Sequence, residues 1–174
     1  LASPNLPDRE SFERYASRSL EQYPTVSAFQ YTDADWVIRY VYPLKTNEAS
    51  LNHDLKTRPD QIQDLAKTQK ERKTVTSNPF RSIQGKLAII VRAPLYVGDE
   101  FRGFAQELFD VNLTAAEMFE DLASDYAIEL RDVNGNVFWQ NGGEAAGAYT
   151  SVAIPIGDNS WRADIRQRQA FHPS

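Results

Sequence analysis

The stretch of sequence that decides the fold is residues 87–111, LAIIVRAPLYVGDEFRGFAQELFDV. It opens on the apolar run 87–91 and continues to Tyr96, which is typical of a strand that is largely buried. Residues 98–100, Gly-Asp-Glu, fit a tight hairpin turn, and a second strand is expected over 101–111. The stretch therefore predicts two long strands joined by a hairpin, in a sheet that other elements cover.

Helices and shorter strands are expected before this hairpin. A first helix spans Pro7–Gln22, where Asp8 can cap it and apolar side chains recur at helical spacing. Pro59 suits the first turn of a second helix, expected over about 59–69. The other expected elements are strands at 25–31, 36–44 and 74–76 and a polar, turn-like segment at 47–59. The first of these strands alternates, so that Gln30 faces opposite to Phe29.

After the hairpin the pattern repeats on a smaller scale. Asn112 is expected to cap a helix over about 113–124, with Met118, Phe119 and Leu122 facing inward. Glycine-containing turns separate short strands expected at 126–131, 136–140, 149–156 and 161–166. This order predicts an α+β fold. A long N-terminal helix leads into two half-sized units, each an antiparallel sheet with a helix against it.

Composition narrows the classes of function. The 174 residues carry a net charge of -5 without a cluster of Lys or Arg, so nucleic-acid binding is not expected. The absence of cysteine removes disulfides, thiolate metal ligands and cysteine nucleophiles. No stretch reaches the roughly 18 apolar residues of a membrane span, and no signal peptide is recognisable. Because the chain begins at Leu1 rather than Met, we expect it to be part of a longer protein.

The sequence contains little of the chemistry that enzymes need. His53 and His172 are the only histidines, and His53 has no second histidine at a metal-ligand spacing. The carboxylates are scattered, and neither a Gly-x-Ser-x-Gly elbow nor a Walker loop is present. We therefore expect no catalytic residue, no metal site and no cofactor. An acid–base pair assembled from distant residues remains open at this point.

Short motifs follow one another in a definite order between Tyr42 and Val111. They are Asn47-Glu48-Ala49, Leu51-Asn52-His53-Asp54-Leu55, Pro59, Thr76-Ser77-Asn78-Pro79-Phe80-Arg81, Gln84-Gly85, Arg92-Ala93-Pro94-Leu95-Tyr96 and Phe101-Arg102-Gly103. With the entry segment 12–28 and the closing segment 159–162, this series resembles the CHASE domain. That domain is an extracytoplasmic sensor of bacterial receptors and the hormone-binding region of plant cytokinin receptors. His53 and Asn78 depart from the family pattern, so the ligand of a relative does not transfer.

The resemblance implies an architecture and a location. Residues 1–23 are expected to form a stalk helix, 24–111 a membrane-distal PAS-like unit and 112–174 a membrane-proximal PAS-like unit. The chain is expected to be the periplasmic or extracellular portion of an inner (cell) membrane protein, with a transmembrane helix beyond each end. A homodimer through the N-terminal helix is expected, and a histidine kinase or a diguanylate cyclase is the usual output. The small molecule is expected in the distal unit.

The expected ligand-binding residues combine the resemblance with residue chemistry. They are Asp54, Thr76, Phe80, Gln84, Arg92, Phe29 and Tyr40. Asp54 resembles an acidic ligand-binding position of the plant receptors, or it only caps a turn. Thr76 lines the pocket or is an ordinary strand residue. Arg92 interrupts a buried strand, so it must pair with a protein carboxylate or an anionic ligand, and the aromatic residues line the pocket or belong to the core.

Three classes of function follow from these features. The first is a sensor domain that binds an unknown small molecule. The second is a ligand-free dimerisation or protein-interaction domain of a membrane receptor, and the third is a small enzyme with an unusual site. An enclosed pocket of ligand size in the distal unit favours the first class. A distal unit filled by Phe29, Tyr40 and Ile90 favours the second.

Overall fold

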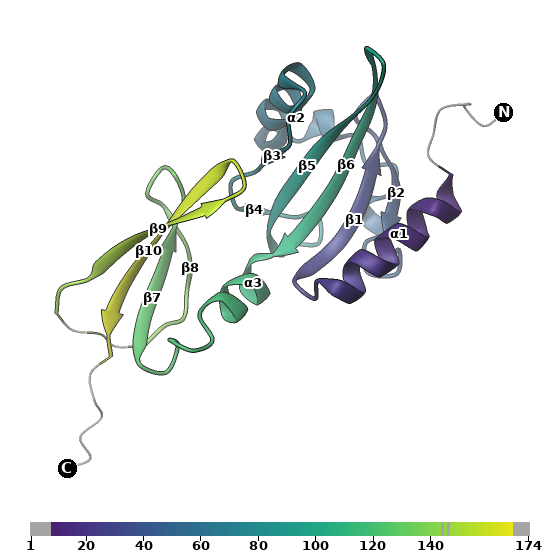
Figure 1. Cartoon of the computed structure of the whole chain (residues 1–174). Coiled ribbons are helices and arrows are strands. Elements are labelled where there is room, and N and C mark those ends of the chain that lie inside the picture. Colours follow the sequence, from purple (N-terminus) through teal and green to yellow (C-terminus); the bar gives the residue numbers. More distant parts are fainter. Residues whose placement is uncertain (1–7, 144, 146, 169–174) are drawn as a thin grey trace. The chain divides into compact units, whose positions relative to one another are not determined.

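The computed structural model describes residues 8–143, 145 and 147–168. The described residues do not include the segments 1–7 and 169–174. Pro7 and His172, which the sequence analysis names, therefore lie outside them. The chain divides into two compact units, Leu1–Asp110 and Val111–Ser174, each built on its own sheet (Figure 1). Both sheets are antiparallel and helices accompany both, which confirms the predicted α+β class.

The first unit contains most of the chain's secondary structure. Its elements are α1 (Arg9–Gln22), β1 (Val26–Thr32), β2 (Ile38–Tyr42), η1 (Glu48–Ser50), η2 (Leu55–Thr57), α2 (Pro59–Glu71), β3 (Val75–Thr76), β4 (Phe80–Arg81), β5 (Leu87–Val97) and β6 (Glu100–Asp110). The strand order is β2-β1-β6-β5-β3, and β4 pairs with the outer side of β5. The β5–β6 hairpin predicted from residues 87–111 thus forms the inner part of the sheet.

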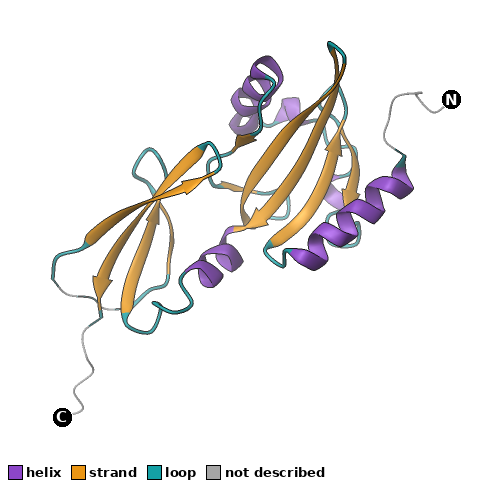
Figure 2. Cartoon of the chain, in the orientation of Figure 1, coloured by secondary structure: helices purple, strands orange, loops and turns teal. Residues whose placement is uncertain are grey.

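The two faces of this sheet are covered by different elements (Figure 2). On one face α1 packs over β1 and β2 through a cluster that includes Phe12, Ala16, Phe29 and Tyr31. Asp8 caps the helix as predicted, since its carboxylate accepts the Ser11 N–H at 3.0 Å, and the helix begins at Arg9 rather than at Pro7. On the other face α2 and the turns η1 and η2 cover the sheet.

The helix α2 is held to its face by an apolar cluster. Leu65 is fully buried against Ile38, Leu55 and Phe104. Pro59 occupies the first helical turn, as predicted. Each fully buried side chain of this kind contributes about 1.5–3 kcal/mol, so this cluster anchors α2 to the sheet.

The second unit is a smaller sheet with one helix. Its elements are α3 (Val111–Met118), β7 (Tyr126–Arg131), β8 (Val137–Gln140), β9 (Thr150–Ile156) and β10 (Asn159–Gln167), with strand order β8-β7-β10-β9. Its core contains Ile128, Leu130 and Trp161. Just beyond α3, Phe119 stacks on Trp139 with ring centroids 6.0 Å apart.

Two expectations for α3 are wrong. The helix starts at Val111 directly after β6, so Asn112 lies inside it and does not cap it. Only Phe119 of the three side chains expected inward is buried, whereas Met118 and Leu122 are more than a third exposed. The helix ends at Met118, six residues before the expected end, and residues 119–125 form turns.

The opposite face of the second sheet is polar. Asp164, which is buried, accepts hydrogen bonds from Ser151 and Arg131 at 2.5 and 2.8 Å, and Arg162 contacts it at 3.1 Å. Burial disfavours the charged form, but these hydrogen bonds outweigh it and hold the pKa of Asp164 below its ordinary value. This face is thus held together by an ion-pair network that is satisfied within the sheet.

Gly103 is the position in β6 that no other residue can occupy. It lies at φ +124°, and a side chain there would collide with the backbone carbonyl of Thr32 on the neighbouring strand. Gly98, at the tip of the hairpin, also has a positive φ of +59° but faces open space. Both close packing and backbone conformation therefore require glycine at position 103, whereas only backbone conformation favours it at position 98.

This difference predicts the outcome of two matched substitutions. We expect Gly103→Ala to lower the free energy of unfolding by more than about 3 kcal/mol, because the sheet must part to admit the methyl group. Gly98→Ala is expected to lose only about 1 kcal/mol, the cost of a left-handed alanine. Urea unfolding followed by circular dichroism measures both, and equal losses would contradict the proposed close approach.

Candidate functional site

A row of polar side chains crosses the covered face of the first sheet. The registers place Gln30 opposite Gln106 and Gln106 opposite Arg92. Directly opposed residues of antiparallel strands point to the same side, so all three lie beneath α2 and the turns. Their exposed fractions are 3%, 1% and 1% respectively, which places three polar groups where apolar side chains are usual.

Hydrogen bonds between side chains satisfy this row. The Arg92 guanidinium donates to Gln106 Oε1 at 2.5 Å and, from Nη2, to Gln61 Oε1 on α2 at 3.0 Å. Gln106 Nε2 in turn donates to Thr32 Oγ1 at 2.6 Å. The network therefore joins β5, β6, β1 and the covering helix.

Arg92 is a charged group in an almost water-free position. Burial lowers its pKa to about 10, and the negative charge of Asp64 acts in the opposite direction. The side chain is therefore still cationic at neutral pH. Its guanidinium carbon also lies 5.7 Å from the centre of the Phe104 ring, an additional favourable contact.

A small cavity lies beside this network, and we call it the polar cavity. Its volume is about 20 Å³, which is room for one water molecule. It is lined by Gln30, Ile38, Ser50, Leu55, Arg58, Gln61, Phe80, Ser82, Ile83, Gln84, Ile90 and Leu108. The lining thus combines apolar walls with several amide and hydroxyl groups, the mixture that small-molecule sites use.

The segment from Phe80 to Lys86 covers this cavity, and side chains from two neighbouring segments hold it. Gln84 Nε2 donates to Ser50 Oγ at 2.9 Å and to Asn47 Oδ1 at 3.2 Å. Arg58 Nη2 donates to the backbone carbonyl of Arg81 at 3.0 Å. Since β4 pairs only two residues with β5, these side-chain contacts are a large part of what keeps the cover closed.

The structure brings three of the seven expected ligand-binding residues together. Phe80 and Gln84 line the polar cavity, and Arg92 lies directly behind Gln61 and Gln106 in the same network. Arg92 donates to neutral amides in these contacts, while the carboxylate whose charge acts on it is that of Asp64. The role of these residues in ligand binding stays a prediction.

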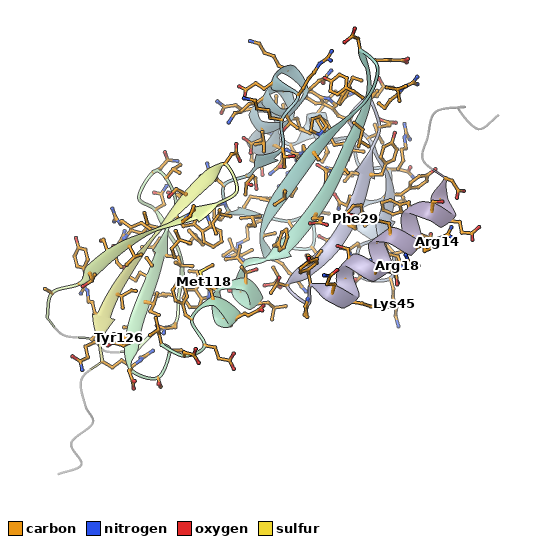
Figure 3. All side chains as sticks on the ribbon, in the orientation of Figure 1. Arg14, Arg18, Phe29, Lys45, Met118 and Tyr126 are labelled. Carbon is orange, nitrogen blue, oxygen red and sulfur yellow. The ribbon has the colours of Figure 1, made fainter. Side chains whose placement is uncertain are left out.

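The other four expected residues lie elsewhere. Phe29 and Tyr40 pack against Phe12 beneath α1, on the opposite face of the sheet (Figure 3 labels Phe29). Thr76 pairs with Val91 and so points to that opposite face as well. Asp54 caps η2, accepting the Lys56 N–H at 2.9 Å, and its side chain is about two-fifths exposed.

Gln30, Gln61, Gln106 and Arg58 are site residues that sequence reasoning missed. One signal was present: Gln30 and Thr32 are buried polar residues on the side of the strand that also carries Ala28. Gln106 shows the same polar interruption in β6. The pairing of the two with Arg92 depends on strand register, which the local sequence does not contain.

Two other hollows occur in the described residues. A groove of about 340 Å³ runs beside α1, lined by Ser11, Phe12, Tyr15, Phe29, Gln30, Tyr31, Leu95 and Ala105. A hollow of about 150 Å³ in the second unit is bordered by Glu129, Gln140, Asp164 and Arg166 among others. The first is apolar. The second mixes apolar and polar residues and belongs to the ion-pair face of the second sheet.

The described residues contain no group of three or more His, Asp or Glu side chains placed to hold a metal ion. None of the described helices has the length and apolar character needed to cross a bilayer.

Solved structures with a similar fold come from bacterial receptors. An extracellular ligand binding receptor from Desulfohalobium retbaense DSM5692 has a TM-score of 0.71 at 13% identity, over 93% of this chain and 33% of its own. The sensor domain of the V. cholerae histidine kinase DctB has a TM-score of 0.65 at 10% identity, over 93% of this chain and 79% of its own. The ligand binding domain of the Pseudomonas aeruginosa PAO1 chemoreceptor PctC, solved with GABA, has a TM-score of 0.63 at 10% identity, over 94% of this chain and 82% of its own. The fold is therefore that of receptor sensor domains.

The sequence itself identifies the family. Residues 5–139 match the family model of the CHASE domain, which is well over half of the chain. The chain therefore belongs to the CHASE domain family, and the resemblance inferred from the motifs between Tyr42 and Val111 is confirmed. Fold and family are those of a signal-transduction sensor domain and not of a catalytic domain, as predicted. No curated protein sequence matches the chain significantly.

The contacts of Gln84 predict how firmly the cover is closed. We expect Gln84→Ala to accelerate amide hydrogen exchange in segment 80–86 and to cost about 1 kcal/mol of global stability, because two neutral hydrogen bonds are lost. Lys86→Ala is the control, since the Lys86 side chain is exposed on the same segment. Equal exchange in both variants would show that Gln84 does not hold the cover.

Proposed function

We propose that this CHASE domain is the extracytoplasmic, periplasmic part of a transmembrane receptor and that it binds a small molecule in the polar cavity. In this proposal residues 24–111 are the membrane-distal unit and 112–174 the membrane-proximal one, with transmembrane helices beyond the chain. The observation that supports it is the polar cavity: buried amides and hydroxyls beside apolar walls, beneath a cover held by few contacts.

The cavity must widen to accept a ligand. At about 20 Å³ it has room for one water molecule, whereas sites for small organic ligands are usually several hundred Å³. Segment 80–86 is the part that can move, because it is tied by Gln84 and Arg58 rather than by a continuous strand ladder. A ligand that replaces these contacts with its own shifts the population toward the open cover.

Strand β1 offers a route from the cavity to the N-terminal helix. Gln30 lines the polar cavity, while the flanking residues Phe29 and Tyr31 belong to the cluster beneath α1. Phe29 lies 5.6 Å, ring centre to ring centre, from Phe12 of α1. A displacement of β1 on ligand binding therefore moves the floor on which α1 rests, and α1 carries it toward the membrane.

A thermal-shift screen of metabolites against the whole chain tests this function. A ligand at a hundred times its Kd stabilises the domain by about 2.7 kcal/mol, which raises the Tm by several degrees. We expect Ile90→Trp, which fills the polar cavity, to abolish that shift, and the milder Ile90→Phe to reduce it. Val152→Trp, on an exposed strand position of the second unit, is the control.

Two results of the screen would contradict the proposal. One is a ligand whose shift survives in folded Ile90→Trp, since it must then bind elsewhere. The other is a library, broad in carboxylates, amides and amines, of which no member shifts the wild-type Tm.

The apolar groove beside α1 favours a second function, self-association through the N-terminal helix. Its volume is about 340 Å³, and its lining continues to Tyr15 at the rim, which is 62% exposed, so apolar surface beside α1 is open to a partner. A second copy of α1 is an amphipathic element of the size that such a groove accepts. The receptor would then be a homodimer, with or without a metabolite.

Light scattering after gel filtration distinguishes this second function. We expect the chain to dimerise at high concentration and Tyr15→Glu to be monomeric, because a carboxylate would be buried in an apolar contact. Tyr23→Glu, at an exposed tyrosine outside the groove, should remain dimeric. A monomeric wild type, or equal effects of both substitutions, would exclude dimerisation through this groove.

A further inference from the structure

We infer that the ligand of the polar cavity presents a hydrogen-bond acceptor to Gln30 and has no ammonium group, so that it is a carboxylic acid or a neutral carbonyl compound with an apolar remainder. This inference rests on the proposed function and specifies the ligand of the same site. Three features of the cavity support it: the orientation of its amides, the absence of acidic side chains among the described residues that line it, and the charge of Arg92 behind it.

The orientation of the amides follows from Arg92. A guanidinium can only donate hydrogen bonds, so the two amides that it contacts must turn their oxygens toward it. Gln106 Oε1 lies 2.5 Å from Arg92 Nε, and Gln61 Oε1 lies 3.0 Å from Nη2. The amide nitrogens of both glutamines therefore point away from Arg92.

The orientation of the Gln106 amide in turn fixes that of the Gln30 amide. Its Nε2 donates to Thr32 Oγ1 at 2.6 Å and lies 3.4 Å from Gln30 Oε1. The oxygen of Gln30 thus faces Gln106, and its Nε2 group lies at the other end of the amide. Because Gln30 lines the polar cavity, this NH₂ group is the donor available to a ligand there.

Gln61 also turns its amide nitrogen away from Arg92, but it already makes a hydrogen bond to Asp60. It also lines the polar cavity with its oxygen directed at Arg92. A hydrogen bond from Gln61, together with the larger effect of Arg58, lowers the pKa of Asp60. Gln30 is therefore the stronger of the two donors toward a ligand.

The cavity lacks a partner for a cation. None of the described residues that line it is Asp or Glu. Asp60, close by, is taken by Arg58 in a two-pronged pair at 3.0 and 2.7 Å. A ligand ammonium would therefore be buried without a carboxylate in the lining and close to the cationic Arg92, so its burial is costly.

This inference separates the chain from several proteins of similar fold. The chemoreceptor domains PctC, CtaA and PctB were solved with GABA, L-serine and L-Arg, ligands that each combine an ammonium group with a carboxylate. The acceptor end of such a ligand suits Gln30, but its ammonium does not suit this cavity. The remaining wall, Phe80, Ile83, Ile90 and Leu108, instead fits an apolar group.

Matched pairs of probes test the inference on the whole chain. The pairs are butyrate and GABA, isocaproate and leucine, and phenylpropionate and phenylalanine, each at millimolar concentration in thermal-shift and calorimetric measurements. We expect at least one acid to raise the Tm and its amino partner to bind at least about tenfold weaker. An amino compound that raises the Tm of the wild type but not of Ile90→Trp would overturn the inference, while leaving the proposed function intact.

Substitution of Gln30 tests the amide polarity directly. Gln30→Glu replaces the donor NH₂ by an acceptor oxygen at constant shape, so we expect the acids to lose binding and the amino partners to gain it. Gln30→Met removes the donor without adding charge and should weaken the acids without favouring the amines. An unchanged preference in folded Gln30→Glu would overturn the inference. If no metabolite of any class binds the wild type, the proposed function itself fails.

Discussion

A guanidinium buried inside a sheet imposes more on this domain than any other single group. Arg92 is 1% exposed, and its hydrogen bonds run to the amide oxygens of Gln106 and Gln61. A buried cation without such acceptors would cost several kcal/mol. The sheet and the covering helix must therefore keep these glutamines in place. The same requirement turns the amide nitrogens of both glutamines away from Arg92 and, through Gln106, orients Gln30, which lines the polar cavity.

Strand β1 connects this constraint with the rest of the first unit. Its side chains alternate between the polar cavity and the cluster beneath α1, so Gln30 and Phe29 lie one residue apart on opposite faces. The strand is hydrogen-bonded on both sides, to β2 and to β6. It cannot shift on one face without shifting on the other, which is the property that a sensor needs between its ligand site and its N-terminal helix.

Much of the fold could be predicted from sequence because its signals are local. The apolar run before Arg92 and the turn at Gly98 specify the central hairpin, and the motifs around Asp54 and Phe80 identify the family. The site was predicted only in part, because the face on which a residue lies depends on register across four strands. Phe29, Tyr40 and Thr76 were grouped with Arg92, yet the pairing places them on the other side of the sheet. Gln30 and Gln106 acquire meaning only through that pairing.

The small volume of the polar cavity is compatible with a sensing function. A sensor needs two arrangements that differ by only a few kcal/mol, so that a ligand's binding energy decides between them. The cover is held by neutral hydrogen bonds of Gln84 and by the contact of Arg58 with the carbonyl of Arg81, each worth about 1 kcal/mol or slightly more. The second unit shows the contrast, since Asp164 binds Ser151, Arg131 and Arg162 in an ionic network that opposes rearrangement. Within this chain, the lightly held cover lies over the cavity with oriented amides, and that coincidence is why we propose the first unit as the ligand-binding unit.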